Sequence, residues 1–228
     1  DDEHGRKHNS EFTMLEWYRP GLDLKALMHE TADLLEICLM HRFGEIRPII
    51  LSYKHAFQDR LDINPLQATL KQLKDTAHGV GLNLDLGDDR LGYMDLLFSH
   101  FVEPSLGFDA PVFLTDFPSE MASLAKVKQD EDGELVAARF EVYIEGLELA
   151  NAYDELQDAD VLASRFEADN KERAKQGLPV IPTDQHLLAA LPNMPECSGI
   201  ALGIDRLLMV VMNQVKIDQV IAFPAEIA

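Results

Sequence analysis

The segment 138–151 constrains the fold more than any other part of the chain. Two runs rich in apolar, β-branched and aromatic residues flank Glu145 and Gly146, a pair that favours a tight turn. Alternate side chains of a strand face opposite sides, so Val142 faces one side and Glu141 the other. The sequence therefore predicts an antiparallel hairpin with one apolar face and one polar face.

Helical and β-rich segments alternate along the rest of the chain. A capping residue before an amphipathic run, with glycine or proline after it, predicts each helix. The expected helices span 23–43, 65–78, 88–103, 158–176 and 205–212, and the expected β-rich runs span 12–18, 112–117, 138–144, 147–151 and 199–204. There is no internal repeat or low-complexity tract, so residues 1–228 are predicted to form a single α+β domain.

Composition limits the possible functions. The chain has 40 acidic and 20 basic residues, a net charge of −20, which argues against a free-standing nucleic-acid-binding module. ATP remains compatible, because a few arginines and a metal ion can hold its phosphates. No apolar run approaches the roughly 20 residues that span a bilayer, so a membrane protein is not expected. The two cysteines fit no metal or disulfide pattern, which indicates a cytoplasmic setting, although the start at Asp1 leaves upstream targeting open.

Two acids in the predicted hairpin suggest a metal site. Glu141 and Glu148 lie on opposite arms of the turn, where their carboxylates can approach each other. Two neighbouring carboxylates repel and are costly to desolvate unless a cation joins them. Oxygen ligands of this kind suit Mg²⁺ that arrives with a nucleotide. A solvated face of the sheet is the alternative interpretation.

Segment 199–206 is a small, apolar strand that delivers Arg206 at the start of a helix. Gly199, Ala201 and Gly203 share one face and leave it nearly bare, so a flat group such as a nucleobase can approach the backbone. An arginine at that edge can stack on a base or clamp a phosphate. Close packing of strand against helix, with Arg206 on the surface, explains the same pattern without a ligand.

Segment 6–18 joins a basic, polar loop to a strand. Phe12, Glu16 and Tyr18 fall on one face of that strand, together with Met14. A mixed face of aromatic, acidic and phenolic groups is unusual for a core and suits a ligand that carries an ammonium group. His8 by itself fits an ordinary loop residue equally well.

Taken together, these segments resemble the class II aminoacyl-tRNA synthetases. Residues 6–18 resemble the loop and second strand of motif 2, and the Gly-Ile-Asp-Arg sequence at 203–206 resembles motif 3. Segment 139–155 resembles the region that lysyl enzymes use for metal and lysine. The resemblance implies an antiparallel sheet flanked by helices, truncated at its N-terminus. The chain starts inside motif 2, so motif 1, which builds the dimer interface of this class, is missing. A longer, homodimeric natural protein is expected.

Within the class, the chain is most similar to the elongation factor P–lysine ligases, paralogues of lysyl-tRNA synthetase that have no anticodon-binding domain. The similarity rests on segments 16–20 and 197–199, and on Ala150, which replaces the glycine usual in the tRNA enzymes. It implies that ATP activates lysine or (R)-β-lysine as an adenylate, which then passes to a lysine side chain of elongation factor P; tRNA is not the expected acceptor. The methyl group of Ala150 is expected to reshape the pocket near the substrate amino group.

The resemblance also implies a role for each matching residue. For ATP and Mg²⁺, the implied contacts are Arg6 and His8 over the phosphates, Phe12 on the adenine, Arg206 at the γ-phosphate, and Glu141 and Glu148 on the metal. For the lysine-type substrate, they are Glu16, Tyr18, Ser123, Ala150, Asn151 and Glu155. Arg6 and Arg206 are the expected catalytic residues, because adenylate formation depends on positioning and charge neutralisation.

Two other readings remain open. The chain could be the catalytic core of a lysyl-tRNA synthetase whose upstream part carries an anticodon domain. It could also be a non-catalytic paralogue that serves as a binding partner. Retention of Glu141, Glu148, Glu155 and Arg206 speaks against the second of these, because a protein without activity does not need all four.

Overall fold

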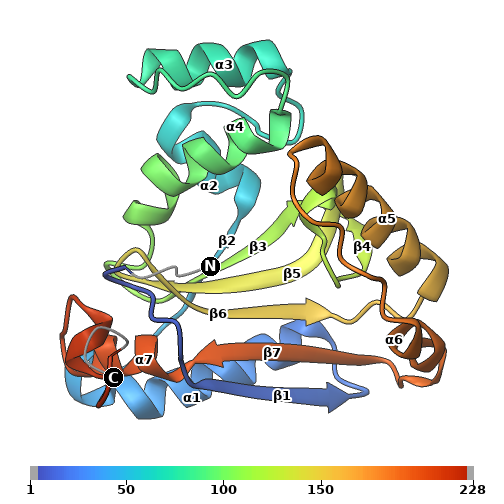
Figure 1. Ribbon diagram of the computed structural model, residues 1–228. Helices are drawn as coiled ribbons and strands as arrows, with labels where there is room; N and C mark the ends of the chain where they lie inside the picture. Colours follow the sequence, from blue (N-terminus) through green and yellow to red (C-terminus); the bar gives the residue numbers. More distant parts are fainter. Residues whose placement is uncertain (1–4, 225–228) are drawn as a thin grey trace.

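The computed structural model describes residues 5–224, which form a sheet flanked by helices (Figure 1). Within that range the strands lie in the order β1-β7-β6-β5-β3-β2, and β4 pairs with β5. The strands are β1 (Met14–Pro20), β2 (Ile49–Ser52), β3 (Val112–Pro118), β4 (Val127–Gln129), β5 (Leu135–Ile144), β6 (Leu147–Asp154) and β7 (Cys197–Gly203). The predicted antiparallel arrangement is confirmed with one exception, since β2 runs parallel to β3.

The helices differ from the predicted set in a few places. They are α1 (Leu24–Phe43), α2 (Tyr53–Leu61), α3 (Leu70–Gly79), α4 (Arg90–Leu97), α5 (Ala159–Lys175), α6 (Gln185–Ala190) and α7 (Ile204–Val211). A π-helical turn, η1 (Phe98–Val102), and a 3₁₀ turn, η2 (Glu103–Ser105), extend α4. The sequence pattern did not predict α2, α6, β2 or β4. None of these helices is long and apolar enough to cross a membrane.

Local capping explains where the predicted helices begin. Asp23 accepts a hydrogen bond from the Ala26 amide at the start of α1, as the sequence indicated. The predicted start of α3 at Pro65 is wrong: the helix begins after Thr69, which forms a capping box with Gln72. The five residues before Thr69 form a turn instead, so a helix-compatible proline did not mark a helix start there.

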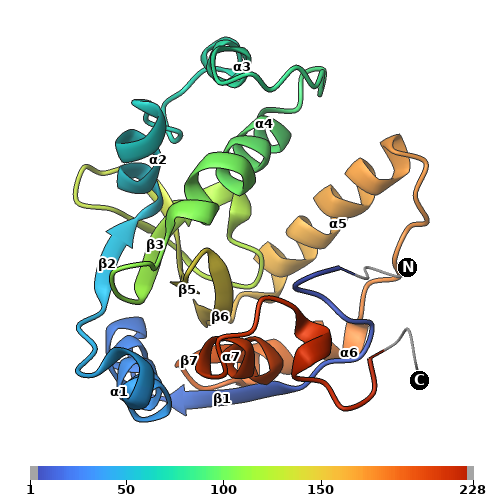
Figure 2. The same ribbon diagram turned by 90° about the vertical axis from the view of Figure 1, so that its left-hand side faces the viewer.

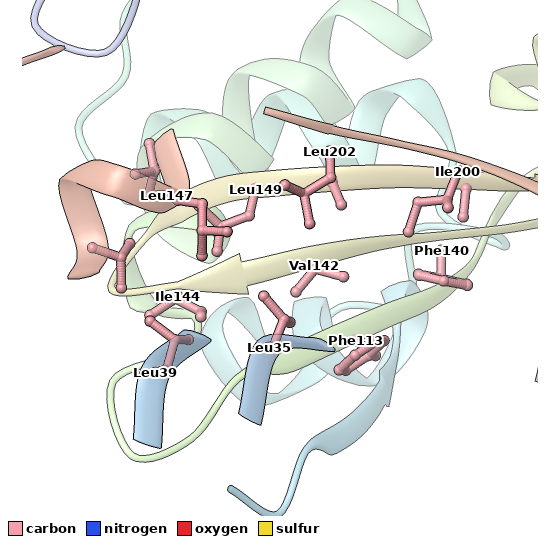
Figure 3. Packing of buried hydrophobic residues seen from close by; sticks show 14 of the residues in the cluster. Leu35, Leu39, Phe113, Phe140, Val142, Ile144, Leu147, Leu149, Ile200 and Leu202 are labelled. Carbon is pink, nitrogen blue, oxygen red and sulfur yellow. The ribbon is translucent and has the colours of Figure 1, made fainter. Parts of the chain in front are cut away.

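The two faces of the sheet have different coverings. On one face, α1 and α7 pack on Phe140, Val142 and Ile144, the apolar face predicted for the hairpin. Figure 3 shows Leu35 and Leu39 of α1 within this cluster. On the other face, α2, α3 and α4 cover only the part near β3, through a second apolar cluster. These three helices leave the rest of that face, over β6, β7 and β1, uncovered.

The β5–β6 hairpin is confirmed, and it contains an irregularity that matters for the site. Glu145 and Gly146 both have positive φ angles, 53° and 68°, as a tight hairpin turn requires. Tyr143 pairs with Glu148, but Val142 pairs with Ala150, so Leu149 is an extra residue in β6. This β-bulge reverses the alternation, and Glu148 and Asn151 therefore face the same side although three positions separate them.

Candidate active site

One residue from each of four adjacent strands forms a row across the open face. Glu16 pairs with Ala201, Ala201 with Asn151, and Asn151 with Glu141. Directly paired residues of a sheet point to the same side, so these four side chains lie in line. The small side chain of Ala201 leaves a gap in the middle of the row, between an acid at one end and an acid and an amide at the other.

A second row lies beside the first. Tyr18, Gly199, Tyr153 and Arg139 pair in turn across the same four strands. A methyl group on Gly199 would come within 2.4 Å of Glu155 Oε1 and 2.6 Å of Tyr18 Cε1. The Glu155 carboxylate and the Tyr18 ring therefore meet above this glycine, which only a residue without a side chain permits.

Arg206 joins three parts of the chain at one end of the open face. Its Nη1 donates to the Glu148 carbonyl at 2.8 Å and to Glu148 Oε2 at 3.4 Å, and its Nη2 lies 2.9 Å from His8 Nε2. The adjacent Asp205 accepts a hydrogen bond from the Thr13 amide at 2.6 Å, which fixes the loop to the start of α7. The predicted approach of a hairpin acid, Glu148, to Arg206, which follows the last strand, is therefore present.

Glu141 is buried beside this cluster. Its carboxylate accepts hydrogen bonds from Arg139 Nη2 and, at 2.5 Å, from the Tyr143 hydroxyl. Burial raises the pKa of Glu141 to about 7, with a further contribution from Glu148, although Arg139 opposes the shift. A cation placed between Glu141 and Glu148 would relieve this repulsion.

Glu141 and Glu148 could hold a metal ion only if a bound nucleotide and water supply its other ligands. Within residues 5–224, no group of three or more His, Cys, Asp or Glu side chains is arranged to hold a metal ion. Glu141 and Glu148 therefore supply too few ligands for Mg²⁺, which usually retains waters and takes its other ligands from substrate phosphates. The two carboxylates would suit a magnesium ion whose other ligands come from water and nucleotide phosphates.

A cavity of about 330 Å³ lies next to Arg206. His8, Phe12 and Asn151 border it, as do the backbone and small side chains of the last strand at Ala201 and Gly203. Phe12 is 65% exposed and borders this cavity, so its ring is available to a flat ligand. The bare strand face and the aromatic ring could thus enclose a nucleobase, with Arg206 at the phosphate end.

The substrate end of the face contains an unsatisfied acceptor. Asn151 Nδ2 donates to the Tyr153 hydroxyl at 3.0 Å, whereas the buried Asn151 Oδ1 has no hydrogen-bond partner among the described residues. Burial, followed by the charge of Asp154, raises the pKa of the nearby Glu155 to about 7. Buried polar atoms normally find a partner, so this end requires a donor. An ammonium group could supply both the hydrogen bond and the positive charge.

Three predicted site residues lie differently from the others. The Arg6 side chain is exposed and does not border the 330 Å³ cavity, and its carbonyl accepts a hydrogen bond from the Ile217 amide. Ser123, with a positive φ of 49°, borders a second cleft instead. Ala150 pairs with Val142, belongs to the apolar cluster under α1 and is 3% exposed. The β-bulge turns this side chain toward the core, but Ala150 also borders the 330 Å³ cavity, so the expectation that its methyl group reshapes the pocket near the substrate amino group stays a prediction.

Several residues of the site were not predicted from the sequence. Arg139 and Tyr143 share a face with Glu141, and Tyr153 shares one with Asn151, so strand alternation alone could have identified them. Lys7 and Glu103, whose Nζ and Oε1 lie 3.7 Å apart, gave no such signal. Lys7 also donates to the Gly146 carbonyl at 2.6 Å and so holds the loop against the hairpin turn.

Comparisons with known proteins identify the family. The family of class II tRNA synthetases (D, K and N) matches residues 1–227. A protein of Pectobacterium atrosepticum named elongation factor P–(R)-β-lysine ligase is 48% identical over 229 residues, covering 99% of this chain and 68% of the relative. Proteins of the same name from Yersinia pestis and Yersinia pseudotuberculosis are 47% identical over 230 residues, covering 100% of this chain and 69% of each relative. The chain therefore belongs to the class II tRNA synthetase family.

Proposed function

We propose that the protein containing this chain activates lysine or (R)-β-lysine with ATP and transfers it to a lysine side chain of elongation factor P. The names of relatives that share 47–48% identity with the chain support this assignment. The observation that carries the proposal is the arrangement of charged side chains at the two ends of the open face of the sheet. At one end, Arg206 can neutralise a phosphate and Glu148 can hold a metal ion, and at the other end Glu155 can pair with an ammonium group.

The nucleotide would lie along the cavity beside the last strand. Phe12 covers the adenine, Arg206 neutralises the γ-phosphate, and His8 holds the loop over the phosphates. Arg6, whose side chain is exposed on the same loop, would reach the phosphates only after the loop moves. Glu141 and Glu148 would hold Mg²⁺, which supplies positive charge to the phosphates when it is bound.

The amino acid would lie across the two rows of side chains. One ammonium group of the amino acid donates a hydrogen bond to the side-chain oxygen of Asn151 and pairs with Glu155 and Glu16. Tyr18 covers the aliphatic stem. Its carboxylate attacks the α-phosphorus of ATP, the bond to the β-phosphate oxygen breaks, and pyrophosphate leaves. Held in this way, the two reactants need correct positioning more than a general base.

Pyrophosphate exchange tests the assignment. The full-length protein is expected to catalyse exchange with α-lysine or (R)-β-lysine, and to label elongation factor P but not tRNA. Labelling should disappear when arginine replaces the acceptor lysine. Exchange with neither isomer would overturn the proposal, and labelling of tRNA alone would favour a lysyl-tRNA synthetase. A homodimer and a cytoplasmic location stay predictions of the family resemblance.

Gly199→Ala tests the substrate end of the face. The new methyl group would overlap Glu155 Oε1 and the Tyr18 ring, which must move out of their positions. The KM for the amino acid is expected to rise about 10- to 200-fold, the range for one misplaced carbon in a pocket, while the KM for ATP stays nearly constant. Gly79→Ala is the control, since a methyl group there meets nothing within 4 Å. An unchanged KM in Gly199→Ala would contradict the placement of the substrate.

A further inference from the structure

A second, larger cleft of about 930 Å³ lies beside the proposed reaction centre. Residues of α4 and η1 form one wall and residues of α5 form the other, and Glu141, Tyr143 and Glu148 lie at its floor. Figure 2 shows α4 and α5 on the two sides of the space above β5 and β6. Because the cleft shares both hairpin acids with the reaction centre, whatever enters it arrives at the reacting atoms.

The cleft is acidic. Its lining includes eight carboxylates and two arginines, Arg139 and Arg165. Five of the carboxylates form ion pairs, whereas Asp89, Asp95 and Asp169 form none within residues 5–224. Both guanidiniums are already engaged by the protein: Arg139 donates to Glu141 and to the Met121 carbonyl, and Arg165 donates to the Ser123 carbonyl at 2.5 Å. The field within the cleft therefore attracts cations and repels phosphate groups.

Two carboxylates, one on each wall of the cleft, are available to a ligand. Asp95 comes from α4 and Asp169 from α5, and neither side chain makes a hydrogen bond or ion pair within the part of the chain that the structure describes. Other acids of the cleft are already engaged. Glu120 pairs with Arg90, and Glu172 pairs with a lysine of its own helix.

The deep end of the cleft is aromatic and contains one unsatisfied hydroxyl group. Tyr53 stacks on Phe98 and packs at a tilt against Phe117, with ring centroids 5.2 and 5.1 Å away. Tyr53 is 1% exposed, and its hydroxyl has no hydrogen-bond partner among residues 5–224. Apolar rings that end in an unpaired oxygen, surrounded by carboxylates, match an alkylammonium group: the stem packs on the rings and the head donates hydrogen bonds.

We propose that this cleft is the entrance for the lysine-bearing segment of the acceptor protein. This inference rests on the proposed function, which requires a protein lysine to reach the activated amino acid. The lysine enters as an ammonium ion and gives up a proton to solvent. Its nitrogen then attacks the carbonyl carbon of the adenylate, a C–N bond forms, the C–O bond to phosphate breaks and AMP leaves, while the nitrogen releases a second proton to solvent and keeps one in the amide. The volume lies near the upper end of the range for small-ligand pockets, which leaves room for a turn of the acceptor backbone beside the side chain.

The same charges discriminate between possible acceptors. A tRNA acceptor end carries a phosphate for every nucleotide, and each phosphate would meet the uncompensated acids of this cleft. A basic protein segment gains from the same field, both in its rate of encounter and in its orientation. The acidic cleft therefore favours a protein acceptor over tRNA.

Removal of the two available charges tests the inference. Asp95→Asn and Asp169→Asn, made singly and together in the full-length protein, change charge without changing volume. The KM for elongation factor P is expected to rise about 3- to 10-fold for each and about 10- to 50-fold for the pair, as for charges at the rim of an interface. Pyrophosphate exchange with the amino acid should change less than twofold, because these acids lie away from ATP. Added salt should reduce the difference between variant and wild type.

Asp33→Asn is the matched control, because it removes one exposed charge from α1, which packs on the other face of the sheet. Transfer that is unchanged in the double variant, or lowered equally in Asp33→Asn, would overturn the inference. A fall in pyrophosphate exchange that parallels the fall in transfer to elongation factor P would also overturn the inference, because Asp95 and Asp169 would then act on activation of the amino acid. Absence of exchange in the wild-type protein would instead remove the proposed function, and the inference with it.

Discussion

Arg206→Ala is expected to lower kcat/KM for amino-acid activation by about 10³-fold, the usual loss when one preorganised group at a transferring phosphate is removed. The guanidinium contacts Glu148 and His8 at once, so its loss removes positive charge from the phosphate site and leaves Glu148 without its ion-pair partner. Arg206→Lys should recover little activity, because an ammonium cannot reproduce the planar fork that contacts two groups. Pyrophosphate exchange provides the measurement.

Arg19→Ala is the control for this experiment. Arg19 makes a comparable pair with Glu30, at 2.5 Å, between β1 and α1 and away from the open face. Its removal should leave the rate of exchange within about twofold of wild type, since exposed ion pairs contribute about 1 kcal/mol or less to stability. If Arg206→Ala kept more than a tenth of the wild-type kcat/KM, the role of Arg206 in phosphate binding would be refuted.

The second large effect is expected at Glu155. Glu155→Gln keeps the shape of the side chain but removes the charge that would pair with the substrate ammonium. Loss of one partner from a buried charge pair typically costs about 3–5 kcal/mol, which corresponds to at least a 100-fold rise in the KM for the amino acid. The KM for ATP should stay close to wild type, because Glu155 does not border the nucleotide cavity.

The pH dependence provides an independent check on the same residue. The pKa of Glu155 is raised to about 7, so the carboxyl is protonated and uncharged below that pH. The value of kcat/KM for the amino acid should therefore fall about tenfold per unit as the pH drops well below 7, and Glu155→Gln should remove the contribution of this group. A profile identical in wild type and Glu155→Gln would exclude the proposed pairing. Because Glu141 also titrates near 7, the profile for ATP serves as the comparison.

Stability should show the opposite trend with pH. Both Glu141 and Glu155 bind protons more tightly in the folded protein than in the unfolded chain, because burial raises their pKa values. As the pH rises through about 7, the folded protein must release these protons and ionise buried groups, so stability is lost. Substrates that supply cations would restore it, and the Tm increase on addition of ATP, Mg²⁺ and lysine should be larger at pH 8 than at pH 6.

The sequence by itself determined the local features of this protein. Alternation along β5 and the Glu145-Gly146 turn specified the hairpin, and Asp23 with Gly44 set the limits of α1. The Gly-Ile-Asp-Arg motif specified a strand that passes directly into α7 with Arg206 at its start. Each of these signals depends on residues a few positions apart, and such short-range preferences can be read from the chain without knowing its fold.

Only the tertiary structure decided which side chains meet. The β-bulge at Leu149 places Glu148 and Asn151 on the same face and turns Ala150 into the core, and strict alternation along β6 would have predicted otherwise. Pairing of β1 with β7, nearly two hundred residues away, brings Glu16 into line with Glu141. The cleft between α4 and α5 depends on helices that approach each other only in the folded chain. Register and packing are set by contacts between distant segments, and the periodicity of one segment carries no information about them.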